Sequence, residues 1–373
     1  MTQSLPRHMP ALDGLRGVAI LMVVLTHVGD GWRRALMIMQ DADGMAPLDV
    51  PHWLAMICGR AAFGVTLFFV VSAFTLTVQA GRRDDGWMAY AVRRIARVGP
   101  GYWLAGLAYT LAAGIGPRLL APNGVAPLDL LVATVFGSAW QGGASLAVVP
   151  GGWSVSCEVT FYAVLLPLLW VIKGRLLRAI ALTVAAGIGA QMLGRYALQH
   201  GGLTSPAYFF PLVQAPVFLC GITAALIAQR APIPRIPGAA IVMLAVAIFG
   251  LPFSPIQEWH LLPHLAFAGV SAATVVLAAL HPPYFLASLV MRRIGEVSYS
   301  MYLVHFAVLA PSLSLAEWAA PGDDWRTLIL HFGLTATCSF GLACLTYRWV
   351  EQPCIQGAAR WLRAYRARPA FNV

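Results

Sequence analysis

Long apolar runs recur along the whole chain, separated by short polar segments rich in arginine, glycine and proline. Ten of these runs approach the ~20 residues with which an α-helix crosses a bilayer. They cover residues 11–29, 56–79, 98–116, 154–172, 179–198, 208–229, 237–252, 262–280, 297–315 and 327–349. The stretch 128–140 is also apolar but too short to span, and we expect it to form an interfacial or re-entrant segment. The pattern predicts an all-α, polytopic membrane protein with about ten transmembrane helices.

The composition supports a membrane protein. Of the 373 residues, 59% are hydrophobic and only 11% are charged, whereas soluble domains carry about 25% charged residues. The net charge of +10 does not call for a nucleic-acid partner, because Lys and Arg collect in the cytoplasmic loops of membrane proteins. The six cysteines show no CxxC spacing and no histidine at metal-ligand spacing. We therefore expect buried thiols and no metal site.

The distribution of basic residues predicts the orientation. With the N-terminus in the cytoplasm, 19 of the 25 Lys and Arg residues fall in cytoplasmic segments and 6 in outer ones. This asymmetry fits the positive-inside rule with ten spans and both termini cytoplasmic. We expect a membrane domain over residues 1–353 and a basic cytoplasmic tail over residues 354–373. The first apolar run is expected to stay as an uncleaved span.

The first apolar run, ALDGLRGVAILMVVLTHV, carries two ionisable groups, Arg16 and His27. Their separation is nearly three helical turns, or about 16 Å along the axis, so both side chains share one face at two depths. Ionisable groups inside a membrane are costly and indicate function. We expect Arg16 to hold an anionic or carbonyl group and His27 to move a proton. The alternatives are that Arg16 extends to the interface and that His27 only joins helices through a hydrogen bond.

Small and acidic residues surround Arg16. Asp13 is predicted to cap the start of this helix, where an acid suits the positive end of the helix dipole. Gly14 and Gly17 leave space beside Arg16, so that another backbone or a ligand can come close.

Three arginines stand at the start of the third apolar run, in the segment RRIARVGPGYW. Arg93 and Arg97 are one turn apart on one face, with Arg94 beside them. Such a cluster suits phosphate groups. Anchoring of the span at the cytoplasmic interface, or contact with anionic lipid heads, explains the cluster equally well.

The segment GGWSVSCEVTFY places Ser154, Glu158 and Tyr162 on one helical face. Counted from the outer side of the membrane, Glu158 lies about one turn inside, at a depth compatible with that of His27. A carboxylate beside an imidazole orients the ring and stabilises its protonated form. The alternative is that Glu158 pairs with another polar group for packing only.

Two other segments carry polar groups among apolar residues. In AFGVTLFFVVSAFTLT, Ser72 lies among small and aromatic residues, and a packing seam explains this segment at least as well as a site. In SYSMYLVH, Ser298, Tyr302 and His305 form a polar stripe. For His305 taken alone, a structural hydrogen bond is the favoured interpretation.

The last apolar run ends in YRWVEQP. Arg348 and Glu351 are spaced to pair at i, i+3, and Pro353 is expected to end the helix. We interpret this segment as structural.

Taken in order, these segments resemble the acyltransferase-3 family of polytopic membrane acyltransferases over essentially the whole chain. The family's opening block holds an Arg and a His separated by ten residues, here Arg16 and His27. The chain departs mildly from the family pattern at Ala73, where Gly is usual, at Val155, where Leu is usual, and at Gln352, where Lys is common. The other matching blocks are AFGVTLFFVVSAF, RRIARVGPGYW, GGWSVSCEVTFY, SYSMYLVH and YRWVEQP.

The resemblance implies transfer of an acyl group, usually acetyl, from coenzyme A to a hydroxyl of an extracytoplasmic or lipid-linked glycan. It implies a multi-pass protein of the bacterial cytoplasmic (inner) membrane, with acyl-CoA as a co-substrate, no permanently bound cofactor and no nucleic-acid partner. Membrane lipids and the glycan acceptor are the other expected partners. The expected catalytic residues are His27, Glu158 and Arg16; Arg16, Arg93, Arg94 and Arg97 are expected to bind acyl-CoA, and Trp153, Ser72, Tyr302 and His305 to bind substrate.

Other functions stay open at this point. Some members of the family act on antibiotics or other small molecules, so the acceptor does not follow from the resemblance. Ten spans with buried His, Glu and Arg also suit a proton-coupled transporter or flippase, although the chain shows no internal two-fold repeat. A non-catalytic sensor with the same fold is a further alternative, and the intact Arg16, His27 and Glu158 argue against it.

Overall fold

The computed structural model describes residues 5–6, 8–43, 51–82, 86–117, 121, 123–141, 146–200, 207–230, 261–321 and 325–367. Within these ranges the chain is helical and contains no β-strand, which confirms the predicted all-α class. Seven described segments are long and apolar enough to cross a membrane. They are Pro10–Gly29, Trp53–Ala80, Gly152–Ile172, Leu176–Ala197, Pro211–Ala228, Ser298–Ala319 and Trp325–Arg366.

These seven segments correspond to seven of the ten predicted spans. The predicted span 98–116 falls in the second half of α4 (Gly86–Ala113), a helix that starts before the arginine cluster and continues through it. The predicted span 262–280 falls in α10 (Leu261–Leu280), and the predicted span 237–252 lies outside the described residues. The polytopic class is thus supported, while the number ten and the cytoplasmic placement of the termini stay predictions.

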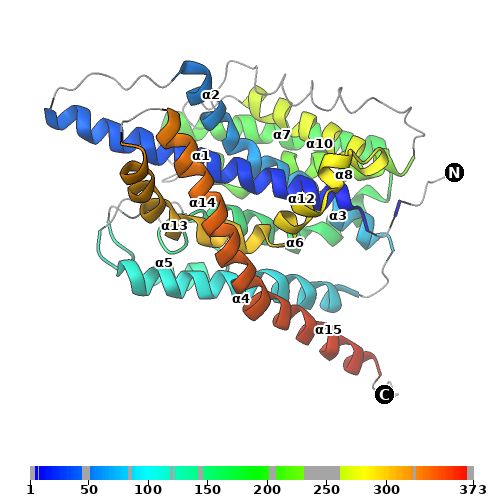
Figure 1. The fold of residues 1–373 in the computed structure, drawn as a ribbon. Helices are drawn as coiled ribbons and strands as arrows, with labels where there is room; N and C mark the ends of the chain where they lie inside the picture. The colour runs from blue at the N-terminus through cyan, green and yellow to red at the C-terminus, as the bar shows by residue number, and fades with distance from the viewer. Residues whose placement is uncertain are drawn as a thin grey trace.

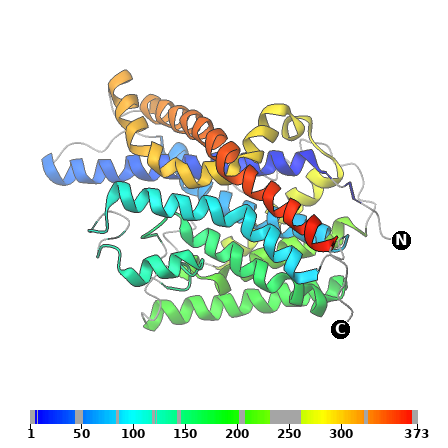
Figure 2. The same cartoon turned by 90° about the horizontal axis from the view of Figure 1, so that it is seen from below.

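The longest described helix, α1 (Pro10–Asp43), runs through the middle of the bundle (Figure 1). Its neighbours include α2 (His52–Arg60), α3 (Gly64–Ala80), α12 (Leu289–Glu296) and α13 (Ser298–Ala319). In both views the start of α1 and the end of α15 (Gln352–Arg366) point toward the same end of the bundle (Figures 1 and 2). Because α1 touches helices from both halves of the chain, the groups on it can meet groups from all of them.

Direct backbone contact fixes the start of α1. A Cβ on Gly14 would lie 2.0 Å from the carbonyl oxygen of Leu286, and a Cβ on Gly295 would lie 1.8 Å from the carbonyl oxygen of Asp13. Only glycine permits so close an approach of two helices. The predicted close approach beside Arg16 is therefore confirmed, and the partner is the backbone of α11 (Tyr284–Ala287) and α12.

The remaining helices pack around α1 and the helices that contact it. Helices α3, α8 and α10 pack against one another and α7 covers α8, whereas α14 continues through a π-helical turn, η4, into α15. Figure 1 shows α14 and α15 as one oblique rod that passes over α4. The bounds are α5, Pro127–Thr134; α6, Gly152–Ile172; α7, Leu176–His200; α8, Pro211–Ala228; α14, Trp325–Thr346; and η4, Tyr347–Glu351, with short 3-10 turns η1, Ala61–Phe63, and η3, Ala207–Phe209.

The segment expected to be a basic tail begins inside a helix. Residues 354–366 belong to α15, which packs against α4. One side of this helix, including Ile355 and Ala358, lines the main cavity described below. Residues 354–366 therefore contribute to the wall of that cavity.

The segment before α6 folds back into the protein. The apolar stretch 128–140 forms the short helix α5 and then a loop whose Ser138 hydroxyl lies 3.1 Å from the Tyr102 hydroxyl. Residues 147–149 are buried, and Gly151, with φ of +75°, turns the chain into α6. As a result α6 begins inside the bundle rather than at its surface.

Candidate active site

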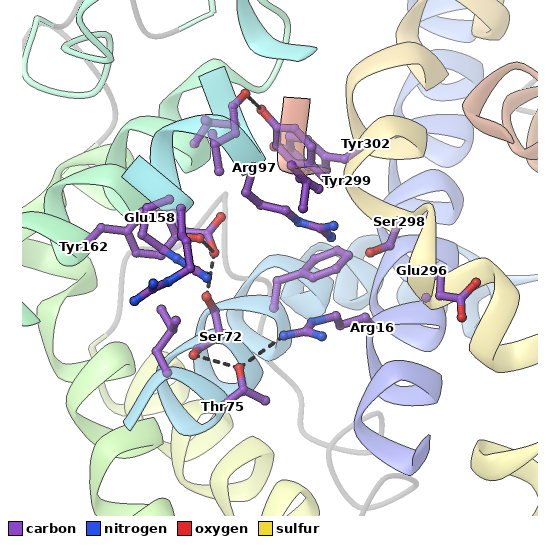
Figure 3. Close-up of a pocket in the computed structure, with 18 of the residues that line it drawn as sticks. Arg16, Ser72, Thr75, Arg97, Glu158, Tyr162, Glu296, Ser298, Tyr299 and Tyr302 are labelled. Carbon is purple, nitrogen blue, oxygen red and sulfur yellow. Dashed lines mark hydrogen bonds between the residues drawn. The ribbon is translucent and has the colours of Figure 1, made fainter. Parts of the chain in front are cut away.

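A cavity of about 450 Å³ opens between α1, α3, α4, α6, α13 and α15 (Figure 3). Its lining is unusually polar for the interior of an apolar bundle. The polar and charged lining residues are Asp13, Arg16, Ser72, Thr75, Gln79, Arg93, Arg94, Arg97, Ser154, Glu158, Tyr162, Glu296, Ser298, Tyr299, Tyr302 and Tyr347. The structure thus gathers seven predicted site residues in one place: Arg16, the three clustered arginines, Ser72, Glu158 and Tyr302.

Arg16 reaches this cavity from the first turns of α1. Its Nη1 donates to Asp13 Oδ1 at 3.1 Å, and its Nη2 donates to the Thr75 hydroxyl at 3.1 Å. Thr75 donates in turn to backbone carbonyls of its own helix, α3. Asp13 lies in the first turn of α1, which begins at Pro10, so it is not the predicted N-cap residue. The guanidinium is held between two helices with part of its N–H edge directed at the cavity.

Glu158 accepts two short hydrogen bonds on one oxygen. The Ser72 hydroxyl and the Tyr162 hydroxyl both lie 2.6 Å from Glu158 Oε1. Among the described residues no group donates to the second oxygen, Oε2. The Arg94 guanidinium stands 5.8 Å above the centre of the Tyr162 ring, so a cation and a carboxylate share this wall of the cavity.

The predicted contact between Glu158 and His27 is wrong. Glu158 lies beside Ser72 and Tyr162 in the same cavity as Arg16, whereas His27 stands farther along α1 and does not line that cavity. The reason is the start of α6 inside the bundle, which moves Glu158 deeper than a count from the outer surface suggests. Glu158 is therefore level with the arginines and not with the imidazole.

His27 packs against a second histidine. Its ring centre lies 5.2 Å from that of His305 and 4.5 Å from that of Phe306. His305 is fully buried, and its Nδ1 lies 2.7 Å from the Tyr302 carbonyl oxygen. Because a carbonyl only accepts, Nδ1 carries the hydrogen and Nε2 presents a lone pair. That Nε2 has no hydrogen-bond partner among the described residues.

Tyr302 connects the cavity with the two histidines. Its ring centre lies 5.7 Å from that of His305, and its hydroxyl lines the cavity beside α6. This hydroxyl donates to the Gly151 carbonyl at 2.9 Å and accepts from Ser154 at 2.7 Å. A Cβ on Gly151 would lie only 2.6 Å from the same hydroxyl, so glycine is required here both for φ and for space. Tyr302 fixes the start of α6.

Trp153, like His305, is a predicted substrate-binding residue that does not line the cavity. Its side chain is 6% exposed, and its ring stacks on Phe209 at 4.6 Å between ring centres and meets Phe69 edge-on at 6.2 Å. These contacts make it a packing residue between α6, η3 and α3.

Glu351 is a site residue that the sequence analysis missed. Instead of pairing with Arg348, its fully buried carboxylate accepts from Ser300 and lies 3.9 Å from Arg97 Nη1. The cause is the π-helical turn Tyr347–Glu351, which changes the direction of the side chains, while Arg348 stacks on Trp349. Such π-helical turns are frequent at functional sites, but the regular spacing of YRWVEQP does not reveal one.

Comparisons with known proteins identify the family of this chain. The acyltransferase-3 family, described as "Acyltransferase domain", matches residues 9–348. No solved structure matches the chain. The chain is 24% identical to "Putative peptidoglycan O-acetyltransferase YrhL" of Bacillus subtilis over 93% of this chain and 55% of that protein. It is 23% identical to "Putative O-acetyltransferase SAS0844" of Staphylococcus aureus, over 93% of this chain and 57% of that protein.

A third relative matches over most of both chains. The chain is 28% identical to "Acyltransferase MdmB" of Streptomyces mycarofaciens, over 81% of this chain and 79% of that protein. By contrast, the chain spans little more than half the length of the two O-acetyltransferase relatives. The family match extends from α1 to the start of η4 and so covers the helices around the cavity other than α15. This chain therefore belongs to the acyltransferase-3 family of membrane acyltransferases.

Proposed function

We propose that the protein transfers an acyl group, in the simplest case acetyl, from cytoplasmic acyl-CoA to a hydroxyl of an extracytoplasmic or lipid-linked glycan. The observation that carries this proposal is the arginine-lined cavity, which adjoins the pair of histidines through Tyr302. The names of the two O-acetyltransferase relatives support acetyl as the group transferred. We expect the protein to act in the bacterial cytoplasmic membrane.

The charge and size of the cavity suit the acyl donor. Coenzyme A combines a polyanionic nucleotide with a long arm that contains amides and ends in the thioester. Arginines recognise phosphates through several parallel hydrogen bonds, and four line this cavity. The volume of about 450 Å³ falls within the ~300–1,000 Å³ of typical small-molecule sites. The free Oε2 of Glu158 is placed to accept an amide N–H of the donor arm.

The reaction needs a base for the acceptor hydroxyl and a hydrogen-bond donor for the thioester oxygen. The acceptor oxygen bonds to the acyl carbon, the carbon–sulfur bond breaks, coenzyme A leaves as its thiolate, and His27 takes the hydroxyl proton. Ser72 and Tyr302 already donate their hydroxyl hydrogens inside the protein. Arg16 uses only two of its five N–H donors on Asp13 and Thr75, so we assign Arg16 to holding the arm of the donor in the cavity, while the developing negative charge on oxygen needs a donor beside His27.

His305 is assigned to the positioning of His27. Its hydrogen bond to the Tyr302 carbonyl fixes the ring, and its ring lies between Tyr302 and His27. The acceptor would approach His27 from the part of α1 beyond the cavity. A small molecule such as an antibiotic is the alternative acceptor, and the experiment below distinguishes it from a glycan.

The proposed function is tested by following the acyl group in cells. The envelope polysaccharides of cells with the wild-type protein should carry acetyl groups that are absent from cells lacking the protein or carrying His27→Ala. Label from acetyl-CoA should appear in the same material in membrane preparations. Label in soluble small molecules with an unchanged envelope would replace the glycan by the alternative acceptor. Absence of label from every fraction would contradict acyl transfer.

Glu351 gives a second test, because it holds Arg97. We expect Glu351→Gln to raise the KM for acetyl-CoA by about tenfold and to change kcat by no more than about twofold, since the variant keeps the side-chain volume but removes the partner charge of Arg97. The matched control is Glu317→Gln on an exposed turn of α13, for which we expect wild-type kinetics. A loss in kcat with an unchanged KM would contradict a role in donor binding.

A further inference from the structure

A second cavity adjoins the first beside the arginine cluster. It has a volume of about 220 Å³ and lies between the end of α3, the start of α4 and one residue of α6. The two cavities share Leu76, Gln79, Arg93 and Arg94 in their lining. The volume of this cavity is smaller than the ~300 Å³ of sites that bury a whole small molecule. The cavity therefore suits one part of a larger ligand that continues into the first cavity.

The chemistry of this second lining differs from that of the first. Trp87 and Tyr90 supply aromatic surface, Gln79 supplies an amide, and Arg93 and Arg94 border the passage to the first cavity. Aromatic rings offer stacking surface to a nucleobase, and an amide can both donate to and accept from its edge. The phosphates of a nucleotide with its base in this cavity would then lie at the arginines.

Two buried polar atoms at this place have no hydrogen-bond partner among the described residues. They are the hydroxyl oxygen of Tyr90 and the Nε of Arg94. A buried polar group without a partner costs free energy that a bound ligand recovers. Both groups belong to residues that line the second cavity, which indicates that a polar ligand forms their missing hydrogen bonds.

We infer that the cavity between Trp87, Tyr90 and Gln79 binds the adenine end of the acyl donor, while Arg93 and Arg94 hold the phosphates at the junction of the two cavities. This inference rests on the proposed function. In this arrangement the nucleotide lies at the start of α4, the arm passes Glu158, Tyr162 and Arg16, and the thioester lies toward Tyr302. Trp87, with 71% of its surface exposed, closes the outer side of the base.

An acyl donor without the nucleotide distinguishes the adenine site from the part of the cavity that binds the arm and the thioester. Acetyl-pantetheine keeps the arm and the thioester but has no nucleotide. We expect Trp87→Ala to raise the KM for acetyl-CoA by about tenfold, the lower range of base–aromatic stacking. Tyr90→Phe should raise it by about fivefold, the loss of one hydrogen bond. The same variants should leave the KM for acetyl-pantetheine within about twofold of wild type. Tyr90→Phe keeps the ring, so its effect reports the hydroxyl.

The control is Trp170→Ala on α6, one turn beyond Leu166. Trp170 is 72% exposed and does not line either cavity, so a general loss of aromatic anchoring at the membrane surface would appear in this variant as well. Equal shifts with both donors, or an unchanged KM in both variants, would overturn the adenine site while the wild-type activity stands. Failure of the wild-type protein to use acetyl-CoA would overturn the proposed function and this inference with it.

Discussion

His27→Ala should lower acyl transfer by about 10²–10⁴-fold at unchanged donor affinity. This is the usual contribution of a positioned general base, and here the imidazole is the group that accepts the hydroxyl proton. The donor site lies in another part of α1, around Arg16, so the Kd for acetyl-CoA should stay within about twofold. The measurement is transfer of labelled acetyl in membranes with matched amounts of protein.

Phe306→Leu is the matched control for this prediction. Phe306 packs against His27 with 4.5 Å between ring centres, so the variant disturbs the packing of the imidazole without removing a proton acceptor. We expect a loss of less than about tenfold. If His27→Ala retained turnover, or if Phe306→Leu lost as much as His27→Ala, the assignment of His27 as base would be withdrawn.

Replacing Arg93, Arg94 and Arg97 together with glutamine should raise the Kd for acetyl-CoA by about 100-fold or more. Hydrogen bonds to charged groups contribute about 1.5–3 kcal/mol each, and about 1.4 kcal/mol is a factor of ten in affinity. All three residues line the cavity, and Arg97 is held by Glu351. The measurement is equilibrium binding of acetyl-CoA to the purified protein in detergent.

The alternative role of the three arginines, anchoring the topology, predicts a different result. The control replaces Arg360, Arg363 and Arg366 of α15 with glutamine, which removes the same charge from a helix that packs on α4. We expect donor binding to be kept in this control. A triple variant of α4 that bound acetyl-CoA normally but reversed the orientation of tagged termini would establish topological anchoring and remove the arginines from the site.

The hydrophobic pattern predicted the class of fold because every membrane span must satisfy its own backbone and bury an apolar surface. It did not predict where α4 begins, since Arg93, Arg94 and Arg97 interrupt the apolar run although the helix continues through them. Two predicted contacts also failed, that of Glu158 with His27 and the structural pairing of Glu351 with Arg348. The prediction placed Glu158 by counting residues inward from the outer membrane surface. That count fails because the loop before Gly151 is buried, so α6 begins inside the bundle.

The other failed contact concerns Glu351. Regular i, i+3 spacing would pair Glu351 with Arg348. A π-helical turn breaks that spacing, so the carboxylate contacts Arg97 and Ser300 instead. A one-residue change in helical winding leaves no trace in hydrophobic periodicity. By contrast, the grouping of Arg16 with the α4 arginines was predictable, because intramembrane charges must gather where they can be solvated or paired.

The most direct test of the account is a structure of the protein with a non-hydrolysable acetyl-CoA analogue. We expect the analogue in the cavity, with its phosphates at Arg93, Arg94 and Arg97 and an amide carbonyl of its arm within hydrogen-bond distance of Arg16. The acyl end should point past Tyr302 toward His27. An analogue bound elsewhere, or bound in this cavity with its acyl end turned away from the side of His27, would contradict the account.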